Sequence, residues 1–304
     1  YITANIWIKK LKINTLVVSN DHNMPNRVVI ETAKIQNIST VYIQHSSVTK
    51  HFPPLTFDYA LLDGVDSLEK YEKIGKTNTT VFLVGILRMD RYIKYIKYKS
   101  QAENIGVCIN SIDPIPRVEE LLYVLTEYFD RSRIYFRPHP NDNRKLWNDI
   151  SNNLRINLST SKTESSLDFL RKVDVIVSGD SNIILEASLM NVYPLYYDFS
   201  EKKLDWYGYL ENNLADHYSD PDTIVAKIRQ LEGNKPNIRQ NAKRYSSTIN
   251  TEYDGRSDEL VREIVKSIKN GNKIDMSKWI RIPDFAIEAY LPKVAMEREQ
   301  GRIL

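Results

Sequence analysis

Cysteine is almost absent from this sequence: its 304 residues include only one, Cys108. A single cysteine cannot form a disulfide within the chain, which favours a reducing compartment. Cys108 stands in the apolar run NIGVCIN (104–110), so we interpret it as a small core residue of a strand. We therefore assign no function to it.

Long apolar runs are also missing. No run approaches the roughly 20 residues that a membrane-spanning helix needs, and we recognise no signal peptide. These absences favour a cytoplasmic protein. The chain begins YITANIWIKK without a methionine, so we expect residues to be missing upstream.

The positive and negative charges of the sequence are nearly balanced. The net charge is +3, and Lys and Arg are not clustered as a nucleic-acid-binding surface requires. An anionic small molecule fits this balance better, so we expect no nucleic-acid partner. With 42% hydrophobic and 27% charged residues, the composition is that of an ordinary globular protein, long enough for two domains.

Metal-ligand spacings are missing too. No His-x3-His or Cys-x2-Cys spacing occurs, so we predict no metal and no other cofactor. The acidic triplet DPD (220–222) is the nearest to a metal motif. Because it precedes a helical pattern, we interpret Asp220 as the N-cap and Pro221 as the first helical residue.

Short apolar runs rich in Val, Ile, Tyr and Phe recur along the chain and alternate with helical patterns. The runs are nearly continuous rather than alternating, which is typical of buried parallel strands. This rhythm predicts an α/β fold of the doubly wound type. The expected strands are 13–19, 39–44, 57–63, 80–85, 104–110, 133–138, 154–159, 173–179 and 192–198; the expected helices are 26–37, 115–129, 182–190, 222–231 and 256–269.

The domain boundary is predicted at the basic, polar segment RYIKYIKYKSQAE (91–103), after which a new apolar strand begins. We expect a first Rossmann-like domain at 1–92, incomplete at its start because about four strands are few for such a unit. A second domain is expected at 93–272. The tail 273–304 loses the alternation, so we expect a closing helix that packs back or an extension to a partner.

Two segments of the second domain carry chemical content. In RPHP (137–140), two prolines hold His139 rigidly at the end of a strand, two residues after Arg137. In VSGDSN (177–182), a polar turn precedes a helix, and Ser181 or Asn182 is a natural N-cap. Ligands of open α/β sheets bind beyond the carboxyl ends of strands, so both segments are candidates for an anion site.

The segment from Ser181 to Ala187, Ser-x-x-x-x-Glu-Ala with Pro194 in the next strand, resembles the donor-nucleotide segment of GT-B glycosyltransferases. It is especially similar to bacterial surface-polysaccharide transferases of the capsule and teichoic-acid kind. Three more segments share this resemblance: VGILRMD (84–90), TVYIQHSS (40–47) and RPHP. The resemblance covers roughly residues 13–268. Ser46 departs from it, because glycine usually follows Gln-His.

The resemblance implies two Rossmann-like domains that face a cleft, and catalysis without a bound metal. Cationic and N–H donors of the second domain must then stabilise the leaving phosphate, and Glu186 would accept hydrogen bonds from ribose hydroxyls. Lys162 and Arg88 are possible further cations, although such residues are more often surface or linker charges. Trp206 and Tyr207 lie where a loop could touch base or sugar, but we interpret them as core or surface aromatics. The implied donor- and phosphate-binding residues are Arg137, His139, Ser178, Gly179, Ser181, Asn182 and Glu186.

The catalytic base is expected after a strand of the first domain. His45 follows the strand 39–44, and an imidazole with an ordinary pKa near 6.5 suits a general base. Asp21 and His22 follow the strand 13–19 in the same way and remain alternatives. Asp63 is a further acid of this position class, and Arg27 could reach an anion.

We therefore expect an inverting glycosyltransferase, because the Glu-x7-Glu pair of many retaining GT-B enzymes is absent: Pro194 stands eight residues after Glu186. The expected partners are a nucleotide-activated sugar, with a CMP-sugar favoured, and a saccharide or lipid-linked saccharide acceptor of a bacterial surface polysaccharide. Peripheral contact at the inner membrane face would follow from such an acceptor. The alternatives are a CDP-alcohol phosphotransferase, a UDP-sugar 2-epimerase and a non-catalytic module of a capsule-assembly protein.

Overall fold

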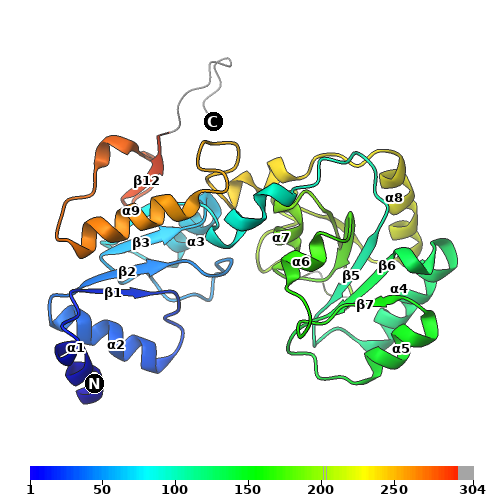
Figure 1. The fold of residues 1–304 in the computed structure, drawn as a ribbon, viewed down its shortest axis with the longest axis horizontal. Helices are drawn as coiled ribbons and strands as arrows, with labels where there is room; N and C mark the ends of the chain where they lie inside the picture. The colour runs from blue at the N-terminus through cyan, green and yellow to red at the C-terminus, as the bar shows by residue number, and fades with distance from the viewer. Residues whose placement is uncertain (201, 203, 294–304) are drawn as a thin grey trace, which may run out of the picture. The chain divides into compact units, whose positions relative to one another are not determined.

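The structure is a computed structural model that describes residues 1–200, 202 and 204–293. The chain forms two compact units (Figure 1). The first contains Tyr1–Arg91 and the chain from Lys243 onward, and the second is Tyr92–Ala242. The first boundary lies beside the residue 92 that the sequence predicts, inside the 3₁₀ helix η1 (Leu87–Tyr95). The second boundary differs, since the chain leaves the second unit thirty residues before the predicted end at 272.

The second unit is built on a fully parallel six-stranded sheet in the order β10-β9-β8-β5-β6-β7. Counted along the chain, this is the 3-2-1-4-5-6 order of a Rossmann fold, and the order reverses between β5 and β8. In register, Cys108 of β5 pairs with Arg137 of β6 on one side and Ser178 of β8 on the other. The strands are β5 (Ile105–Ile109), β6 (Ile134–Pro138), β7 (Asn157–Leu158), β8 (Val175–Ser178), β9 (Tyr193–Tyr197) and β10 (Asp216–Tyr218).

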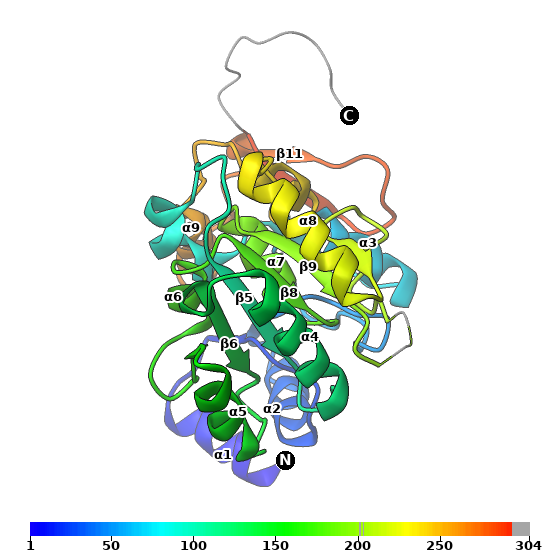
Figure 2. The ribbon, with the colours of Figure 1, turned by 90° about the vertical axis from the view of Figure 1, so that its right-hand side faces the viewer.

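Helices cover both faces of this sheet because its strands are apolar on both sides. Ile105 and Val107 of β5 belong to a core with the buried leucines of α4, and α4 packs beside α8, as Figure 2 shows. Gly106 faces the other way, where an added Cβ would lie 2.9 Å from the ring of Phe169 on α6. The helices of the unit are α4 (Ile115–Tyr128), α5 (Leu146–Leu154), α6 (Ser166–Leu170), α7 (Ile183–Leu189) and α8 (Pro221–Gly233).

The first unit also contains a six-stranded sheet, in the order β1-β2-β3-β4-β12-β11. All neighbours are parallel except β11, which runs antiparallel to β12. The tail therefore packs back as two strands, not as the predicted helix, and its residues 294–304 lie outside the described ones. The strands are β1 (Thr15–Val18), β2 (Ser39–Ile43), β3 (Tyr59–Leu62), β4 (Thr80–Leu83), β11 (Trp279–Arg281) and β12 (Ala289–Pro292).

The segment after residue 242 joins this unit because its helix α9 (Ser257–Lys269) covers one face of the sheet. Leu260 and Ile264 of α9 pack on Val41, Leu61 and Phe82. The opposite face carries α2 (Met24–Ile35) and α3 (Val65–Ile74), and α1 (Ile2–Lys10) packs on α2. A periodic apolar stripe thus assigns α9 correctly as a helix but cannot say which sheet it covers.

Gly64 marks where the returning chain crosses the first sheet. A Cβ added there would lie 2.6 Å from the carbonyl oxygen of Arg244 and 2.9 Å from the backbone nitrogen of Ser246. We expect Gly64→Ala to lower the free energy of unfolding by about 1–3 kcal/mol, because two backbone segments must separate. Urea denaturation measures this loss.

Gly233 provides the matched control, because a Cβ added there would meet none of the described residues within 4 Å. Gly233→Ala is expected to leave stability unchanged or to raise it slightly. Equal stability of the Gly64→Ala variant and the wild-type protein would contradict the close approach.

Most predicted elements are present. Each predicted strand appears with shorter bounds, and α2, α4, α7, α8 and α9 match the predicted helices. Asp220 caps α8 by accepting a 3.0 Å hydrogen bond from the Thr223 amide, as predicted for the DPD triplet. None of the helices in the described ranges has the length and apolar character needed to cross a bilayer.

Candidate functional site

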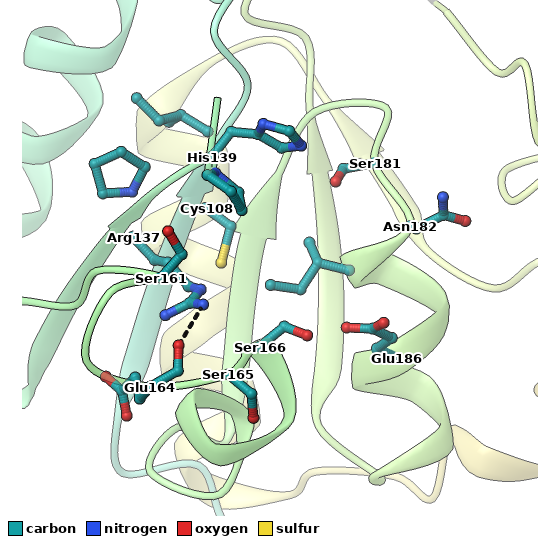
Figure 3. Close-up of a pocket in the computed structure, with 14 residues that line it drawn as sticks. Cys108, Arg137, His139, Ser161, Glu164, Ser165, Ser166, Ser181, Asn182 and Glu186 are labelled. Atoms are coloured by element: carbon teal, nitrogen blue, oxygen red, sulfur yellow. Dashed lines mark hydrogen bonds between the residues drawn. The ribbon is translucent and has the colours of Figure 1, made fainter. Parts of the chain in front are cut away.

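A cavity of about 320 Å³ opens in the second unit where the strand order reverses. Its wall comes from the ends of β5 and β6, the loop 161–166 and the turn 181–183 that leads into α7 (Figure 3). Five predicted donor-binding residues line it. They are Arg137, His139, Ser181, Asn182 and Glu186.

Arg137 is the buried cation of the cavity, with 5% of the residue exposed. Its guanidinium donates 2.5 Å to Ser159 Oγ and 3.1 Å to the carbonyl oxygen of Glu164, and it lies 5.4 Å above the Phe169 ring. These partners orient the group without neutralising it. The carboxylate of Glu164 instead pairs with Lys172 at 2.6 Å, and within the described residues Arg137 has no ion-pair partner.

His139 follows β6 directly, and its ring orientation is set locally. The Asn141 amide donates to Nδ1 at 3.1 Å, and the Asp142 amide donates to the His139 carbonyl at 2.8 Å. When Nδ1 accepts, the proton of a neutral imidazole is on Nε2, which is then a donor. The RPHP segment therefore provides a cation and a neutral N–H donor on one cavity wall (Figure 3).

The turn before α7 differs in part from the prediction. Asn182 is the N-cap of α7 by position, but its side chain makes no capping hydrogen bond, because Asn182 Oδ1 accepts from the Tyr209 hydroxyl at 3.0 Å. Asp180 accepts from the Trp206 amide at 3.2 Å. The loop that contains the predicted Trp206 and Tyr207 is thus fastened to this turn, a use of Asn182 that the sequence does not reveal.

Ser178 and Gly179 are not among the lining residues of the cavity. Ser178 ends β8 with 1% exposure, and its buried hydroxyl has no hydrogen-bond partner in the described part of the chain. Gly179 lies against Phe199 and Asn110, on a different side of the turn. The structure places both residues outside the lining of this cavity, so their role in binding donor phosphate stays a prediction.

Other residues of the cavity were missed in the sequence. Cys108 lines it from β5, although it is 4% exposed and burial raises the pKa of its thiol to about 12. The loop 161–166 contributes Ser161, Ser165 and Ser166. Nothing in its polar composition distinguishes this loop from an ordinary surface connection, so only the fold identifies it.

The three predicted catalytic residues lie together at the carboxyl ends of β1 and β2 in the first unit. His22 Nε2 is 3.7 Å from Asp21 Oδ1, and the rings of His22 and His45 are perpendicular with centroids 6.2 Å apart. Arg88 donates 3.4 Å to the His45 carbonyl, which places that predicted cation beside the group. Arg27 instead donates to the Asp21 carbonyl at 2.9 Å.

Desolvation governs the protonation of this group. His45 is exposed as a residue, but partial desolvation of its ring lowers its pKa, to which the neighbouring charge of His22 adds, and burial raises the pKa of Asp21. Asp21 is 6% exposed, and its Oδ1 has no hydrogen-bond partner among the described residues. A neutral imidazole at His45 is thus favoured at neutral pH, which is the form that accepts a proton.

Asp63, at the end of β3, is buried beside this group. Burial raises the pKa of its carboxyl from 3.8 to about 8, although the charge of Arg88 opposes the rise. The folded chain therefore keeps this proton through a pH range in which the unfolded chain loses it. We expect the free energy of unfolding to fall as the pH rises from about 4 to 8.

Asp63→Asn should remove that dependence and stabilise the protein at pH 8 by about 1 kcal/mol or more. Thermal unfolding across this pH range measures both effects. Asp284→Asn, an exposed position of the same unit, is the matched control. A wild-type profile whose slope survives in Asp63→Asn would refute the assignment.

The described residues contain no group of three or more His, Cys, Asp or Glu side chains that could hold a metal ion. No protein-family model and no curated protein matches the chain.

Solved structures do match it. They include the UDP-GlcNAc 2-epimerase of Neisseria meningitidis bound to UDP-GlcNAc, at 13% identity and a TM-score of 0.58, over 87% of this chain and 79% of that one. The wall teichoic acid polymerase TagF soaked with CDPG matches at 12% identity and 0.54, over 85% and 73%. Phytolacca americana UGT2, complexed with UDP-2fluoro-glucose and pterostilbene, matches at 11% and 0.56, over 88% and 79%.

Identities this low establish the architecture alone. The two Rossmann-like units that the sequence predicts are present, and each is built on a mainly parallel sheet. The chain therefore has the fold of the GT-B glycosyltransferase superfamily, as the resemblance of its motifs indicates.

Proposed function

We propose that this chain is a metal-independent GT-B enzyme that transfers a sugar from a nucleotide-activated donor, with a CMP-sugar favoured. The acceptor would be a growing bacterial surface polysaccharide or glycolipid, reached at the inner face of the membrane. One observation carries the proposal: a single cavity at the reversal of the Rossmann sheet contains the buried Arg137, the Nε2 of His139 and the carboxylate of Glu186.

Such a reaction first requires that the leaving phosphate be stabilised. As the bond between the anomeric carbon and the phosphate oxygen breaks, the electron pair stays on that oxygen. Preorganised donors stabilise this charge most effectively in a site that excludes water. Arg137 is held by Ser159 and by the Glu164 carbonyl, and its remaining N–H groups are available to a phosphate.

The nucleoside is the second requirement. Glu186 lies in the first turn of α7, and Figure 3 shows its carboxylate turned toward the cavity, opposite the RPHP segment. A carboxylate is an acceptor for two hydroxyls, so ribose fits between Glu186 and the phosphate-binding wall. One cationic side chain on that wall is the reason a donor that leaves as a nucleoside monophosphate is favoured.

The acceptor hydroxyl must lose a proton as its oxygen attacks the anomeric carbon. We assign this proton to His45, whose partial desolvation keeps the imidazole neutral. The attack displaces the phosphate in one step and inverts the anomeric centre. Asp21 and His22, which lie beside His45, remain the alternative bases.

A second candidate is a CDP-alcohol phosphotransferase. The structural similarity to TagF soaked with CDPG supports it. In that reaction the activated hydroxyl attacks the outer phosphorus, the bridging P–O bond breaks and CMP leaves with the electron pair. Arg137 and His139 would stabilise the departing phosphate in the same way, so only the transferred group distinguishes the two candidates.

Nucleotide binding tests the proposal directly. We expect free CMP to raise the thermal midpoint of the protein more than UMP or GMP, and His139→Ala to reduce that rise by weakening the phosphate contact. A panel of CMP-, CDP-, UDP- and GDP-activated donors, followed by nucleotide release, separates glycosyl from phosphoryl transfer. UDP-GlcNAc is followed by analysis of the sugar product, because epimerisation releases no nucleotide. If no nucleotide stabilises the protein, the proposal fails.

A further inference from the structure

A second cavity of about 400 Å³ lies in the same unit, on the other side of the RPHP loop. It shares Pro138, His139, Pro140 and Ser161 with the cavity assigned to the donor, so the two are separated by that loop alone. Its remaining wall comes from residues 142–145, 147 and 148, where α5 begins, and from Leu158, Thr160 and Lys162. The proposed donor chemistry uses none of these residues.

The single acidic side chain in this wall is already neutralised. Asp142 has no exposed side-chain surface and accepts 2.9 and 3.0 Å hydrogen bonds from Arg144 Nε, and Trp147 donates to it at 3.0 Å. Burial opposes its ionisation, but the hydrogen bonds from Arg144 and Trp147 outweigh that effect and lower its pKa. Arg144 also donates hydrogen bonds to the carbonyl oxygens of Asn110 and Asp113. The ion pair of Asp142 and Arg144 is therefore held in place and adds no net charge to the cavity wall.

Two lysines of the wall keep their charge uncompensated. Lys145 and Lys162 are exposed, and neither side chain has a hydrogen-bond or ion-pair partner in the described ranges. They come from different segments, one before α5 and one in the loop after β7, and both border the same cavity. Since Asp142 and Arg144 cancel, the described wall has a net charge of +2 from these lysines.

His139 lies between the two lysines and the cavity that contains Arg137. With Nδ1 occupied by the Asn141 amide, His139 has one donor, and the residue borders both cavities. A group bound beside the lysines would therefore lie next to the leaving phosphate. Trp147, 3% exposed and held by Asp142, provides a rigid apolar side against which an anion is partly desolvated.

We propose that this cavity is a second phosphate-binding subsite, in which Lys145 and Lys162 bind a phosphate ester group separate from the one at Arg137. Two flexible ammonium groups suit a phosphate as point charges rather than as a bidentate clamp. The phosphate could belong to a phosphate-bearing acceptor or to the outer phosphate of a nucleoside diphosphate donor. Only this assignment of the source rests on the proposed function; the binding of phosphate does not.

The experiment uses the whole chain and inorganic tripolyphosphate as the probe, titrated calorimetrically at low salt in the presence of saturating CMP. The variant is Lys145→Gln combined with Lys162→Gln. Arg155→Gln is the matched control, because it removes one exposed charge from the other end of the same helix, α5. We expect about tenfold weaker tripolyphosphate binding in the double variant, no change in the control, and a smaller difference at 0.5 M salt.

The source of the phosphate follows from CMP and CDP titrations of the same proteins. A donor phosphate is indicated if the double variant weakens CDP and spares CMP; an acceptor phosphate is indicated if both nucleotides bind normally while tripolyphosphate is weakened. Equal tripolyphosphate binding by the wild-type protein and the double variant, or an equal loss in Arg155→Gln, overturns the subsite. If no nucleotide binds while tripolyphosphate binding still depends on the lysines, the proposed function fails and the subsite stands.

Discussion

Replacing His45 by alanine is expected to lower turnover by about 10²–10⁴-fold, the usual contribution of a general base. CMP affinity should stay within about twofold, because His45 belongs to the first unit and Arg137 and His139 to the second. Neighbouring groups desolvate only part of the His45 ring and the residue as a whole is exposed, so the variant should fold normally. Turnover is measured as nucleotide release from the donor that the panel identifies, and affinity by calorimetry.

His51 supplies the control, since it is an exposed histidine of the same unit outside the Asp21, His22 and His45 group. His51→Ala should keep wild-type turnover. A His45→Ala protein that loses CMP affinity but keeps turnover would reverse the assigned roles. Asp21→Asn then tests the alternative base, because turnover that survives this substitution excludes the Asp21 carboxylate as the proton acceptor.

The pH dependence of kcat/KM distinguishes His45 from an imidazole with an ordinary pKa. Partial desolvation, together with the charge of His22, lowers the pKa of His45 below its ordinary value of 6.5. The protonated ring cannot accept a proton, so kcat/KM should fall only when the pH drops below 6.5, and it should be flat above. A kcat/KM that still rises with pH above 6.5 would exclude His45, with its lowered pKa, as the base.

Arg137→Met is expected to weaken CMP binding by about 100-fold. Two charge-assisted hydrogen bonds to a phosphate contribute about 1.5–3 kcal/mol each, of which only a part is recovered by water in the variant. Methionine keeps much of the side-chain volume against Phe169, so the loss should come from recognition more than from packing. Calorimetric titration with CMP measures it.

Arg133→Met is the matched control, because Arg133 precedes the same strand at its opposite end, where it pairs with Glu232 at 2.7 Å. It should change CMP affinity by less than about twofold. Circular dichroism of both variants checks that β6 is intact. If Arg137→Met binds CMP as the wild-type protein does, the cavity does not hold the nucleotide phosphate.

The sequence alone determined the alternation of strands and helices, and hence the α/β class. Apolar runs such as 104–110 and 173–179 are local signals, because a strand buried on both faces needs a nearly continuous apolar run. Because these signals are local, they also indicated where each strand ends. His139, His45 and Asp21 could be placed at strand ends because polar residues that follow parallel strands lie at one edge of the sheet, and Arg137 is near the end of β6.

Contacts between distant segments could not be read in this way. The stripe on α9 states that one face must be buried, but not that it covers the sheet of residues 15–83 rather than that of 105–218. The loop 161–166 lines the cavity at Arg137, and Asn182 accepts a hydrogen bond from Tyr209, through packing that no local composition predicts.

The tertiary structure also determined which charged side chains are paired and which are not. In the sequence, Lys162 is only a candidate cation, and nothing distinguishes Lys145, Asp142 or Arg144 from ordinary surface residues. Folding buries Asp142, fastens Arg144 to it and leaves the lysines uncompensated beside His139. The sequence determines which groups can ionise, whereas their net effect depends on which of them the fold brings within a few ångströms and removes from water.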